Sequence, residues 1–237
     1  MPLISAHRGG TVVSGQSAAQ RYEHAIRLGV DYVEFDVRKT KDLVSVVWHD
    51  DYTVSGRLIN QFSYGDLTEE LGAEALTFDE MLDIAAGKVG LHLDLKEGGY
   101  EAEVVNKVRD RGALDRLVIT SGDEVVLAIK RQFPEIRAGL SLGDELAGAP
   151  PWVKLRARLS EAFPHVRLQH CKADFVAVHQ QLADFNVLRY CERHALPAWV
   201  WTVDEEPALR RFIADPRVTT VITNRPELAL QIRKARS

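Results

Sequence analysis

Carboxylate side chains gather on one face of two predicted strands. In the stretch YVEFDV the alternation of a strand places Glu34 and Asp36 on the same face, with their Cα atoms about 6.5 Å apart. In LHLDLK the same alternation places Asp94 beside Lys96, with His92 below them. Three carboxylates brought together would repel one another and would be costly to desolvate. A divalent cation resolves both costs, and a ligand set made only of oxygen favours Mg²⁺ or Ca²⁺, with Mn²⁺ as a further candidate.

Two histidines follow other apolar runs of the chain. The stretch ISAHRGG ends its apolar run on His7, which is followed at once by Arg8, and a later run is followed by His49. A histidine titrates near neutral pH, so it can take or give a proton during a reaction. The neighbouring arginine carries a permanent positive charge. These residue types are those of an acid–base site.

Eight short apolar runs alternate with helical patterns along the chain. This alternation predicts an α/β fold in which parallel strands close into a (β/α)8 TIM barrel. The clearest helices are expected over Gln16–Leu28, over Thr77–Ala86 behind a capping box, and over Asp123–Gln132 with Asp123 as its N-cap. The expected strands are Leu3–His7, Tyr32–Val37, Val89–Lys96, Leu117–Ser121, Arg137–Leu142, Asp174–His179, Ala198–Val203 and Thr219–Thr223.

One further apolar run, Leu43–Trp48, does not fit this alternation. It begins six residues after Val37, whereas a parallel crossover needs a dozen or more residues. We therefore expect an antiparallel return that forms a short hairpin after the second strand and brings His49 and Asp50 back to the mouth of the barrel. Residues 50–76 form the longest segment without a clear pattern, and we expect a small insertion or cap there, within a single domain of residues 1–237.

The polar faces of the strands must point at the barrel axis, because their apolar faces pack against the helices. Barrel interiors are normally filled by branched apolar side chains, and the active sites of this fold lie at the carboxyl ends of the strands. An alternative interpretation is that Asp94–Lys96 and Glu34–Arg38 are structural ion pairs. Several polar strand ends beside two histidines favour a reactive centre instead.

Composition excludes several classes of function. The chain has 237 residues and a formal net charge of −4, which argues against a nucleic-acid partner. No apolar run approaches the roughly 20 residues of a transmembrane segment, and no signal peptide is visible. Cys171 and Cys191 are too few for a disulfide framework, so the cytoplasm is the expected location. The oligomeric state does not follow from these features.

The combined motifs resemble those of the glycerophosphodiester phosphodiesterases over nearly the whole chain. The motifs that carry the resemblance are AHRGG, GVDYVEFDVRKTKDLVSVVWHDD, LDLK, WTVD and VITNRPE, in this order. The resemblance implies a (β/α)8 barrel that hydrolyses glycerophosphodiesters to glycerol 3-phosphate and an alcohol. The implied site residues are the catalytic histidines His7 and His49, the metal ligands Glu34, Asp36 and Asp94, the phosphate contacts Arg8 and Lys96, and Trp201 near the glycerol or alcohol end of the substrate.

The chain departs from the family pattern at three places. The family usually opens its first helix with Pro-Glu-Asn-Thr, where this chain has the residues Gly15 to Ala18. The third metal ligand is usually glutamate, whereas Asp94 is one methylene shorter. Ser121 is followed by glycine where an aromatic side chain is common, which opens the site at that point.

We therefore expect a phosphodiesterase that uses one divalent cation and acts on a small-molecule glycerophosphodiester, with His49 as acid and His7 as base. The nucleophile is either water at the cation or the 2-hydroxyl of the substrate. One rival function is lysophospholipase D-type cleavage of lysolipids, which calls for an apolar rim. The other is a barrel that binds a phosphodiester without cleaving it. The candidates for an apolar rim are Leu58, Ile59, Phe62 and Tyr64.

Overall fold

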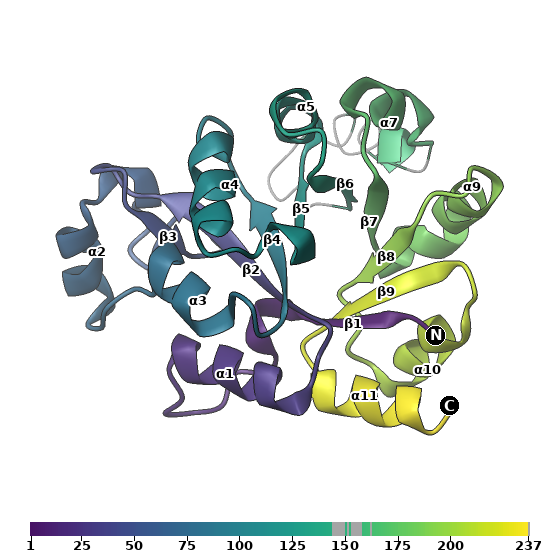
Figure 1. Ribbon diagram of the computed structural model, residues 1–237, viewed down its shortest axis with the longest axis horizontal. Helices are drawn as coiled ribbons and strands as arrows, with labels where there is room; N and C mark the ends of the chain where they lie inside the picture. The colour runs from purple at the N-terminus through teal and green to yellow at the C-terminus, as the bar shows by residue number, and fades with distance from the viewer. Residues whose placement is uncertain (144–149, 151, 153–157, 162, 237) are drawn as a thin grey trace.

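Eight parallel strands close into a barrel, as the alternating pattern predicted. The computed structural model describes residues 1–143, 150, 152, 158–161 and 163–236. The strands pair in the order β1-β9-β8-β7-β6-β5-β4-β2, and β1 pairs with β2 to close the ring (Figure 1). Their bounds are β1 Leu3–Ala6, β2 Tyr32–Lys39, β4 Gly90–Leu95, β5 Leu117–Ser121, β6 Arg137–Leu142, β7 Phe175–His179, β8 Ala198–Trp201 and β9 Val218–Thr223.

The ninth strand, β3 (Ser45–Val47), is the antiparallel return that the short spacing predicted. It pairs with β2 in a register that sets Val47 opposite Val37. The turn between the two strands is closed by Thr40, whose hydroxyl accepts a hydrogen bond from the amide of Val44 at 3.0 Å. This hairpin returns the chain to the carboxyl end of β2, where His49 follows.

Helices follow the strands and cover the outside of the barrel (Figure 1). Their bounds are α1 Ala18–Leu28, α3 Phe78–Ala85, α4 Glu101–Asp110, α5 Asp123–Gln132, α7 His165–Cys171, α8 Gln180–Leu182, α9 Leu188–Arg193, α10 Glu206–Ala214 and α11 Pro226–Lys234. Short 3₁₀ turns lie at η1 His7–Gly9, η2 Ile59–Gln61 and η3 Leu114–Arg116, and a π turn, η4 Ala183–Val187, precedes α9.

Of the two predicted helix caps, the one at Thr77 is confirmed. Thr77 caps α3 in a capping box with Glu80, as predicted, and Ser17 caps α1 in the same way with Gln20. The prediction for α5 was wrong by one residue, because Gly122 is the N-cap and Asp123 is the first helical residue. The carboxylate of Asp123 instead forms an ion pair with Arg167 of α7, at 2.6 Å.

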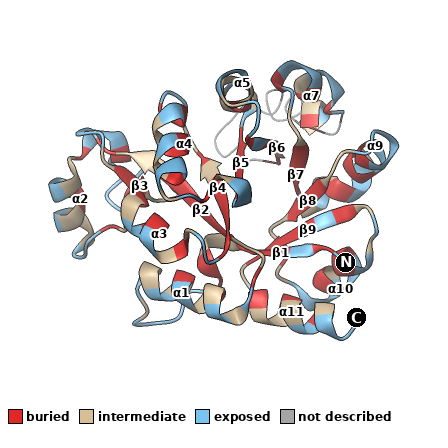
Figure 2. Ribbon diagram, in the orientation of Figure 1, coloured by how far each residue is buried: buried red, intermediate tan, exposed pale blue. Residues whose placement is uncertain are grey.

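Most residues of the barrel strands are buried, whereas the helices alternate between buried and exposed residues (Figure 2). Branched apolar side chains fill the layer between barrel and helices. The inner layer is aromatic instead, because Trp199 packs on Phe175 and Tyr32 with ring centroids 4.7 and 5.2 Å apart. Gly139 makes room for this layer, since a Cβ atom there would lie 2.3 Å from the ring of Phe175.

Residues 50–76 build a small structure of their own beside β3. They include α2 (Tyr64–Leu71), which lies at the outer edge of the molecule in Figure 1. Ile59 and Phe62 are buried at 1% and 2% exposure in a separate apolar cluster that Val46 of β3 completes. They therefore cannot contribute to an apolar rim, which corrects that part of the expectation. The role of this segment as a cap over the site stays a prediction.

No helix in the part of the chain that the structure describes combines the length and apolarity needed to cross a bilayer.

Candidate active site

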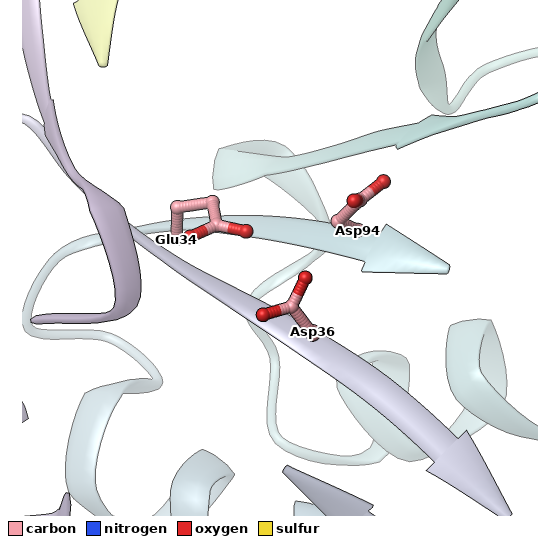
Figure 3. A group of neighbouring side chains, drawn as sticks. All are labelled: Glu34, Asp36 and Asp94. Atoms are coloured by element: carbon pink, nitrogen blue, oxygen red, sulfur yellow. The ribbon is translucent and has the colours of Figure 1, made fainter. Parts of the chain in front are cut away.

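Glu34, Asp36 and Asp94 converge at the carboxyl ends of β2 and β4, where the polar strand faces placed them (Figure 3). The register of the two strands sets Asp36 directly opposite Asp94. One carboxylate oxygen from each residue lies within 4.8 Å of the others. Burial, with Asp36 and Asp94 close by, raises the pKa of Glu34 well above its ordinary value. This unfavourable concentration of buried negative charge is what a hard cation with oxygen ligands would relieve, so the donor set fits Mg²⁺, Ca²⁺ or Mn²⁺.

Two cations border this cluster. The ammonium of Lys96 lies 2.9 Å from Asp36 and also contacts Asp94. Burial would lower the pKa of Lys96, but the two aspartates outweigh it and raise that pKa above its ordinary value, so the side chain keeps its charge. The Asp94–Lys96 pair of the alternative interpretation is thus present. The Glu34–Arg38 pair is not, because Arg38 pairs with Glu97 at 2.7 Å.

Arg8 is held with its guanidinium beside the carboxylates. Its backbone amide donates to Glu34 Oε2 at 2.8 Å, and its Nε lies 3.2 Å from Asp36 Oδ2. The contact between Nε and Asp36 is an ion pair that lacks hydrogen-bond geometry. The buried Nε–H group therefore makes no hydrogen bond to any described residue. Arg8 adopts a left-handed backbone with a φ of 49°, an unusual conformation for a residue other than glycine. Local strain therefore accompanies the placement of this guanidinium.

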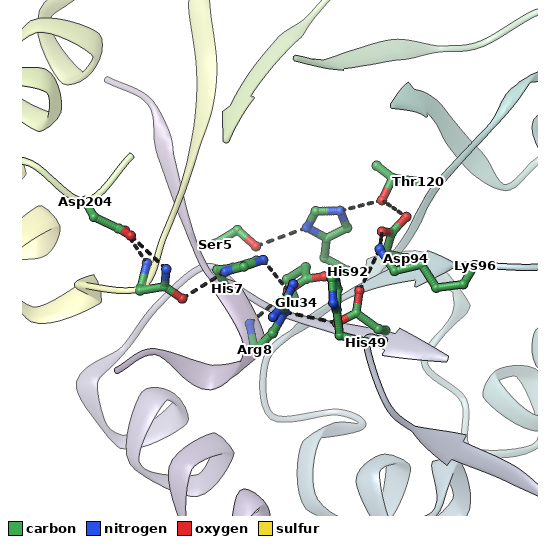
Figure 4. A network of polar contacts seen from close by, with 12 residues as sticks. Ser5, His7, Arg8, Glu34, His49, His92, Asp94, Lys96, Thr120 and Asp204 are labelled. Carbon is green, nitrogen blue, oxygen red and sulfur yellow. Dashed lines mark hydrogen bonds and ion pairs between the residues drawn. The ribbon is translucent and has the colours of Figure 1, made fainter. Parts of the chain in front are cut away.

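His7 is oriented by a chain of hydrogen bonds that reaches the opposite end of the sequence (Figure 4). Its Nδ1 lies 2.8 Å from Oδ1 of Asn224, whose amide nitrogen Nδ2 donates to Asp204 at 2.8 Å. Because Asn224 presents its oxygen, Nδ1 of His7 must carry the hydrogen. The other nitrogen, Nε2, faces the carboxylates and lies 3.9 Å from Glu34. Burial and the adjacent Arg8 lower the pKa of His7 to about 4, so Nε2 is free to accept a proton.

His49 reaches the same region at the end of the hairpin, and Figure 4 shows it among these residues. The preceding residue, Trp48, donates its amide to the carbonyl oxygen of Asp36 at 3.1 Å, which fixes the chain next to the cluster. The carbonyl of His49 accepts from Arg38 Nε at 2.9 Å. Its Nδ1 lies 2.6 Å from the carboxylate of Asp50, which orients the ring and leaves Nε2 for another partner. The second histidine is therefore more exposed than His7.

His92 lies below the carboxylates and supports one of them. Its Nδ1 is 3.1 Å from the hydroxyl of Ser5, and its Nε2 is 3.0 Å from the hydroxyl of Thr120. Thr120 in turn donates to Asp94 Oδ1 at 3.1 Å. Since that hydroxyl gives its hydrogen to Asp94, it must accept from Nε2 of His92, which therefore carries a hydrogen. Burial lowers the pKa of His92 to about 3, so the ring is neutral at ordinary pH. His92 is a supporting group and not a member of the carboxylate cluster.

Trp201 lies across the barrel, at the end of β8. Alternation sets it one layer above Trp199, which is buried at 1% exposure in the aromatic interior. Its ring packs edge-to-face against His179 of β7, with centroids 5.1 Å apart, and its Nε1 has no hydrogen-bond partner among the described residues. Trp201 thus borders the mouth opposite the carboxylates.

The sequence motifs indicated no role for three supporting residues, which are Asn224, Asp204 and Thr120. Thr120 lies at an inward-facing position near the end of β5. Asn224 follows the end of β9, and Asp204 follows the end of β8. Asn224 belongs to the motif VITNRPE and Asp204 to the motif WTVD. Their positions after β9 and β8 were the sequence feature that could have indicated a place in the site.

The chain is similar to known proteins over nearly its whole length. Residues 7–228 match the sequence signature of the glycerophosphoryl diester phosphodiesterase family. A glycerophosphodiester phosphodiesterase from Caldanaerobacter subterraneus is 24% identical over 255 residues, which cover 97% of each chain.

Solved structures share the fold. A glycerophosphodiester phosphodiesterase from Parabacteroides distasonis superposes with a TM-score of 0.80 at 21% identity, covering 99% of this chain and 98% of that one. An Oleispira antarctica phosphodiesterase, solved in complex with the product sn-glycerol-3-phosphate, superposes with a TM-score of 0.72 at 21% identity, covering 98% and 97% of the two chains. The chain therefore belongs to the glycerophosphoryl diester phosphodiesterase family, which confirms the resemblance carried by its motifs and identifies it as a phosphodiesterase.

Proposed function

We propose that this barrel hydrolyses glycerophosphodiesters to glycerol 3-phosphate and an alcohol, with His7 and His49 as the proton carriers. The observation that carries the proposal is the position of His7. Its unprotonated Nε2 faces the three buried carboxylates, while Asn224 holds its other nitrogen. The membership of the chain in its family and the product complex of the Oleispira relative support glycerophosphodiesters as the substrate class.

Glu34, Asp36 and Asp94 would hold one divalent cation, Mg²⁺, Ca²⁺ or Mn²⁺. The cation supplies positive charge to the phosphate oxygens, and that charge counts for more as negative charge builds up in the transition state. Asp94 is shorter than the glutamate usual in the family, and its hydrogen bond from Thr120 holds the carboxylate in place.

Arg8 and Lys96 contribute the remaining positive charge. The buried Nε–H of Arg8 makes no hydrogen bond to any described residue and lies beside the carboxylates, where it can donate to a phosphate oxygen. Lys96 supplies a point charge from the opposite side of Asp36. Both side chains neutralise an anion that would otherwise repel an attacking nucleophile.

The two histidines divide the proton transfers. His7 accepts the proton of the attacking hydroxyl at Nε2, as a new phosphorus–oxygen bond forms. His49 donates a proton to the oxygen of the departing alcohol, as the old phosphorus–oxygen bond breaks. Trp201 provides an apolar ring against the carbon skeleton of the substrate on the other side of the mouth.

The attacking hydroxyl belongs either to water or to the 2-position of the glycerol. Attack by the 2-hydroxyl would produce a cyclic phosphate first, whereas attack by water would not. Phosphorus NMR during turnover distinguishes the two routes through the cyclic species. A substrate that lacks the 2-hydroxyl and is still cleaved would establish the route through water.

Cleavage of lysolipids at the same site is the second candidate. It is favoured by large apolar side chains that stay exposed in the segment after β3, namely Tyr52, Val54 and Leu58. An enzyme with lysophospholipase D activity would turn over lysophosphatidylcholine faster than glycerophosphocholine. Comparison of kcat/KM for these two substrates separates the two functions.

The experiment that tests the proposed function measures glycerol 3-phosphate released from several glycerophosphodiesters, with each cation and with chelator. We expect release that needs a divalent cation and that His7→Ala abolishes. His165→Ala, on the exposed start of α7, is the matched control and should keep full activity. A wild-type protein that binds a phosphodiester but releases no product with any of the three cations would instead establish a binding barrel.

A further inference from the structure

A cavity of about 520 Å³ opens beside Lys96 at the ends of β4 and β5. Its base is made by Lys96, Gly98 and Gly122, and its walls by the first turn of α5 and by α7. Figure 1 shows α5 and α7 side by side, and the Asp123–Arg167 ion pair joins them at 2.6 Å. Because the ammonium of Lys96 also touches Asp36 and Asp94, the cavity begins next to the proposed reaction centre.

Gly122 leaves this space open. A Cβ atom at this position would meet no atom of the described residues within 4 Å, and the glycine has an ordinary φ of −73°. The backbone therefore does not require glycine here, so the residue matters through the side chain it lacks. Ser121, just before it, turns its hydroxyl away to the carbonyl of Leu95 at 2.6 Å.

A chain of contacts links the cavity to the backbone of His49. The carbonyl of His49 accepts from Arg38, which pairs with Glu97, and Glu97 lines the cavity. His49 is the proposed proton donor to the departing alcohol, so the alcohol must lie near it. Trp201 and His179 lie on β8 and β7, across the mouth of the barrel. The two arms of a diester diverge from phosphorus, so one arm can point to Trp201 while the other enters this cavity.

Charged side chains of both signs line the cavity, with a slight excess of acidic groups. Two side chains, Val125 and Val166, are apolar, whereas the rim carries three carboxylates and the cations Lys96 and Arg167. Both of these cations already contact carboxylates. Among the described residues, Glu124 forms an ion pair only with His170, at 3.2 Å, and this histidine is charged only when it is protonated. A long alkyl chain would leave these charges poorly solvated, whereas a short hydrophilic alcohol would not.

We infer that this cavity seats the departing alcohol of the diester, and that it suits short hydrophilic alcohols, with positively charged amino alcohols favoured over neutral ones. The inference rests on the proposed function, because it assigns the second arm of the same substrate. It explains why a glycine follows Ser121 in this chain, since an aromatic side chain there would occupy the cavity.

The test fills the cavity and compares two substrates. Gly122→Trp should lower kcat/KM for sn-glycero-3-phosphocholine at least tenfold more than for sn-glycero-3-phosphomethanol, whose methyl group does not need the cavity. Gly122→Ala adds a single methyl group and should change that ratio less than twofold. An equal loss on both substrates for Gly122→Trp would overturn the inference while leaving the proposed function standing. A wild type that hydrolysed neither diester would end both.

A second variant tests the charge preference. Glu124→Gln should reduce the preference for the choline diester over the neutral glycerol diester by about two- to fivefold, as expected for an exposed charge pair. Glu135→Gln, which precedes β6 at the opposite end of the barrel, is the matched control and should keep the wild-type preference. An unchanged preference in Glu124→Gln would overturn the assignment of amino alcohols, and the Gly122 variants would still decide the position of the alcohol.

Discussion

Asn224 Oδ1 lies 2.8 Å from His7 Nδ1, although the two residues are 217 positions apart. Asp204 holds Asn224 in place, since it accepts from both the backbone amide and the side-chain nitrogen at 2.8 Å. The loops that follow the last two strands of the barrel therefore set the tautomer of a histidine at the end of the first strand. A proton acceptor aimed at the carboxylates is ready before any substrate binds.

Removal of this hydrogen bond should cost catalysis more than substrate binding. In Asn224→Leu we expect kcat to fall about 10²-fold, because the imidazole loses its fixed tautomer, while KM changes little. Nitrogen-15 NMR of labelled histidine should show hydrogen on Nδ1 of His7 in the wild type and a tautomer mixture in the variant. Asn106→Leu, on exposed α4, is the matched control. A variant with an unchanged tautomer and unchanged kcat would contradict this role.

Asn224→Asp should move the pH dependence of the reaction. A carboxylate against Nδ1 stabilises the imidazolium, so the pKa of His7 should rise from about 4. As a base His7 must be unprotonated, and the acidic limb of kcat/KM should therefore move to higher pH. The profile of kcat/KM between pH 4 and 8 checks this prediction. An acidic limb that moved to lower pH would contradict it.

Metal binding and stability should respond in opposite directions to Glu34→Gln. The buried carboxylate is destabilised by burial and by Asp36 and Asp94, so a neutral amide should raise the melting temperature of the metal-free protein. The same change removes a ligand charge, so the stabilisation by added cation, about 2.7 kcal/mol at a hundredfold excess over Kd, should largely disappear. Thermal melts with and without Mn²⁺ measure both. Glu103→Gln, at an outer ion pair, should keep the full response to the cation.

The chain from Ser5 through His92 and Thr120 to Asp94 should support metal affinity. Thr120→Val keeps the shape of the side chain but removes the hydroxyl that donates to Asp94 and accepts from His92. We expect metal affinity to weaken about tenfold, as for other residues that orient a ligand. Titration calorimetry measures this, with Thr219→Val on the outward face of β9 as the control. Equal metal affinities in the wild type and in Thr120→Val would show that the hydrogen bond from Thr120 to Asp94 does not support metal binding.

Acid should destabilise the fold through its buried histidines. Burial lowers the pKa of His92 to about 3, from an ordinary value of 6.5, so the unfolded chain binds more protons between these values. The contribution of His92 to stability is therefore complete above pH 6.5 and is lost as the pH falls toward 3. In His92→Gln the slope of unfolding free energy against pH should decrease by about 1.4 kcal/mol per pH unit in that window. Urea unfolding in chelator between pH 4.5 and 7.5 tests this, and His165→Gln should keep the wild-type slope.

The aromatic interior of the barrel should not tolerate a larger residue at Gly139. A Cβ atom there would lie 2.3 Å from the ring of Phe175, so Gly139→Ala should destabilise the protein by about 1–3 kcal/mol through overpacking. Phe175→Leu should recover part of that loss in the double variant, because it opens space at the contact. Additive losses in the two variants would show that the ring and the glycine are not coupled.

The amino-acid pattern alone was enough to predict most elements of this protein and the faces of its strands. Period-two patterns and crossover lengths are local properties, so Tyr32–Val37 and the antiparallel return Leu43–Trp48 could be recognised without long-range information. The same alternation placed Glu34 and Asp36 on one face, and the resemblance of the motifs identified the family.

Which side chains meet across the barrel depends on how the strands close and could not be read from local pattern. Closure through β1 and β9 brings Asn224 to His7, and the register of β2 with β4 sets Asp36 opposite Asp94. Arg38 forms its ion pair with Glu97 and not with Glu34. Ile59 and Phe62 are buried in a separate apolar cluster. In both cases packing against distant elements outweighs the local pattern. The space beside Gly122 likewise exists only because α5 and α7 come together there.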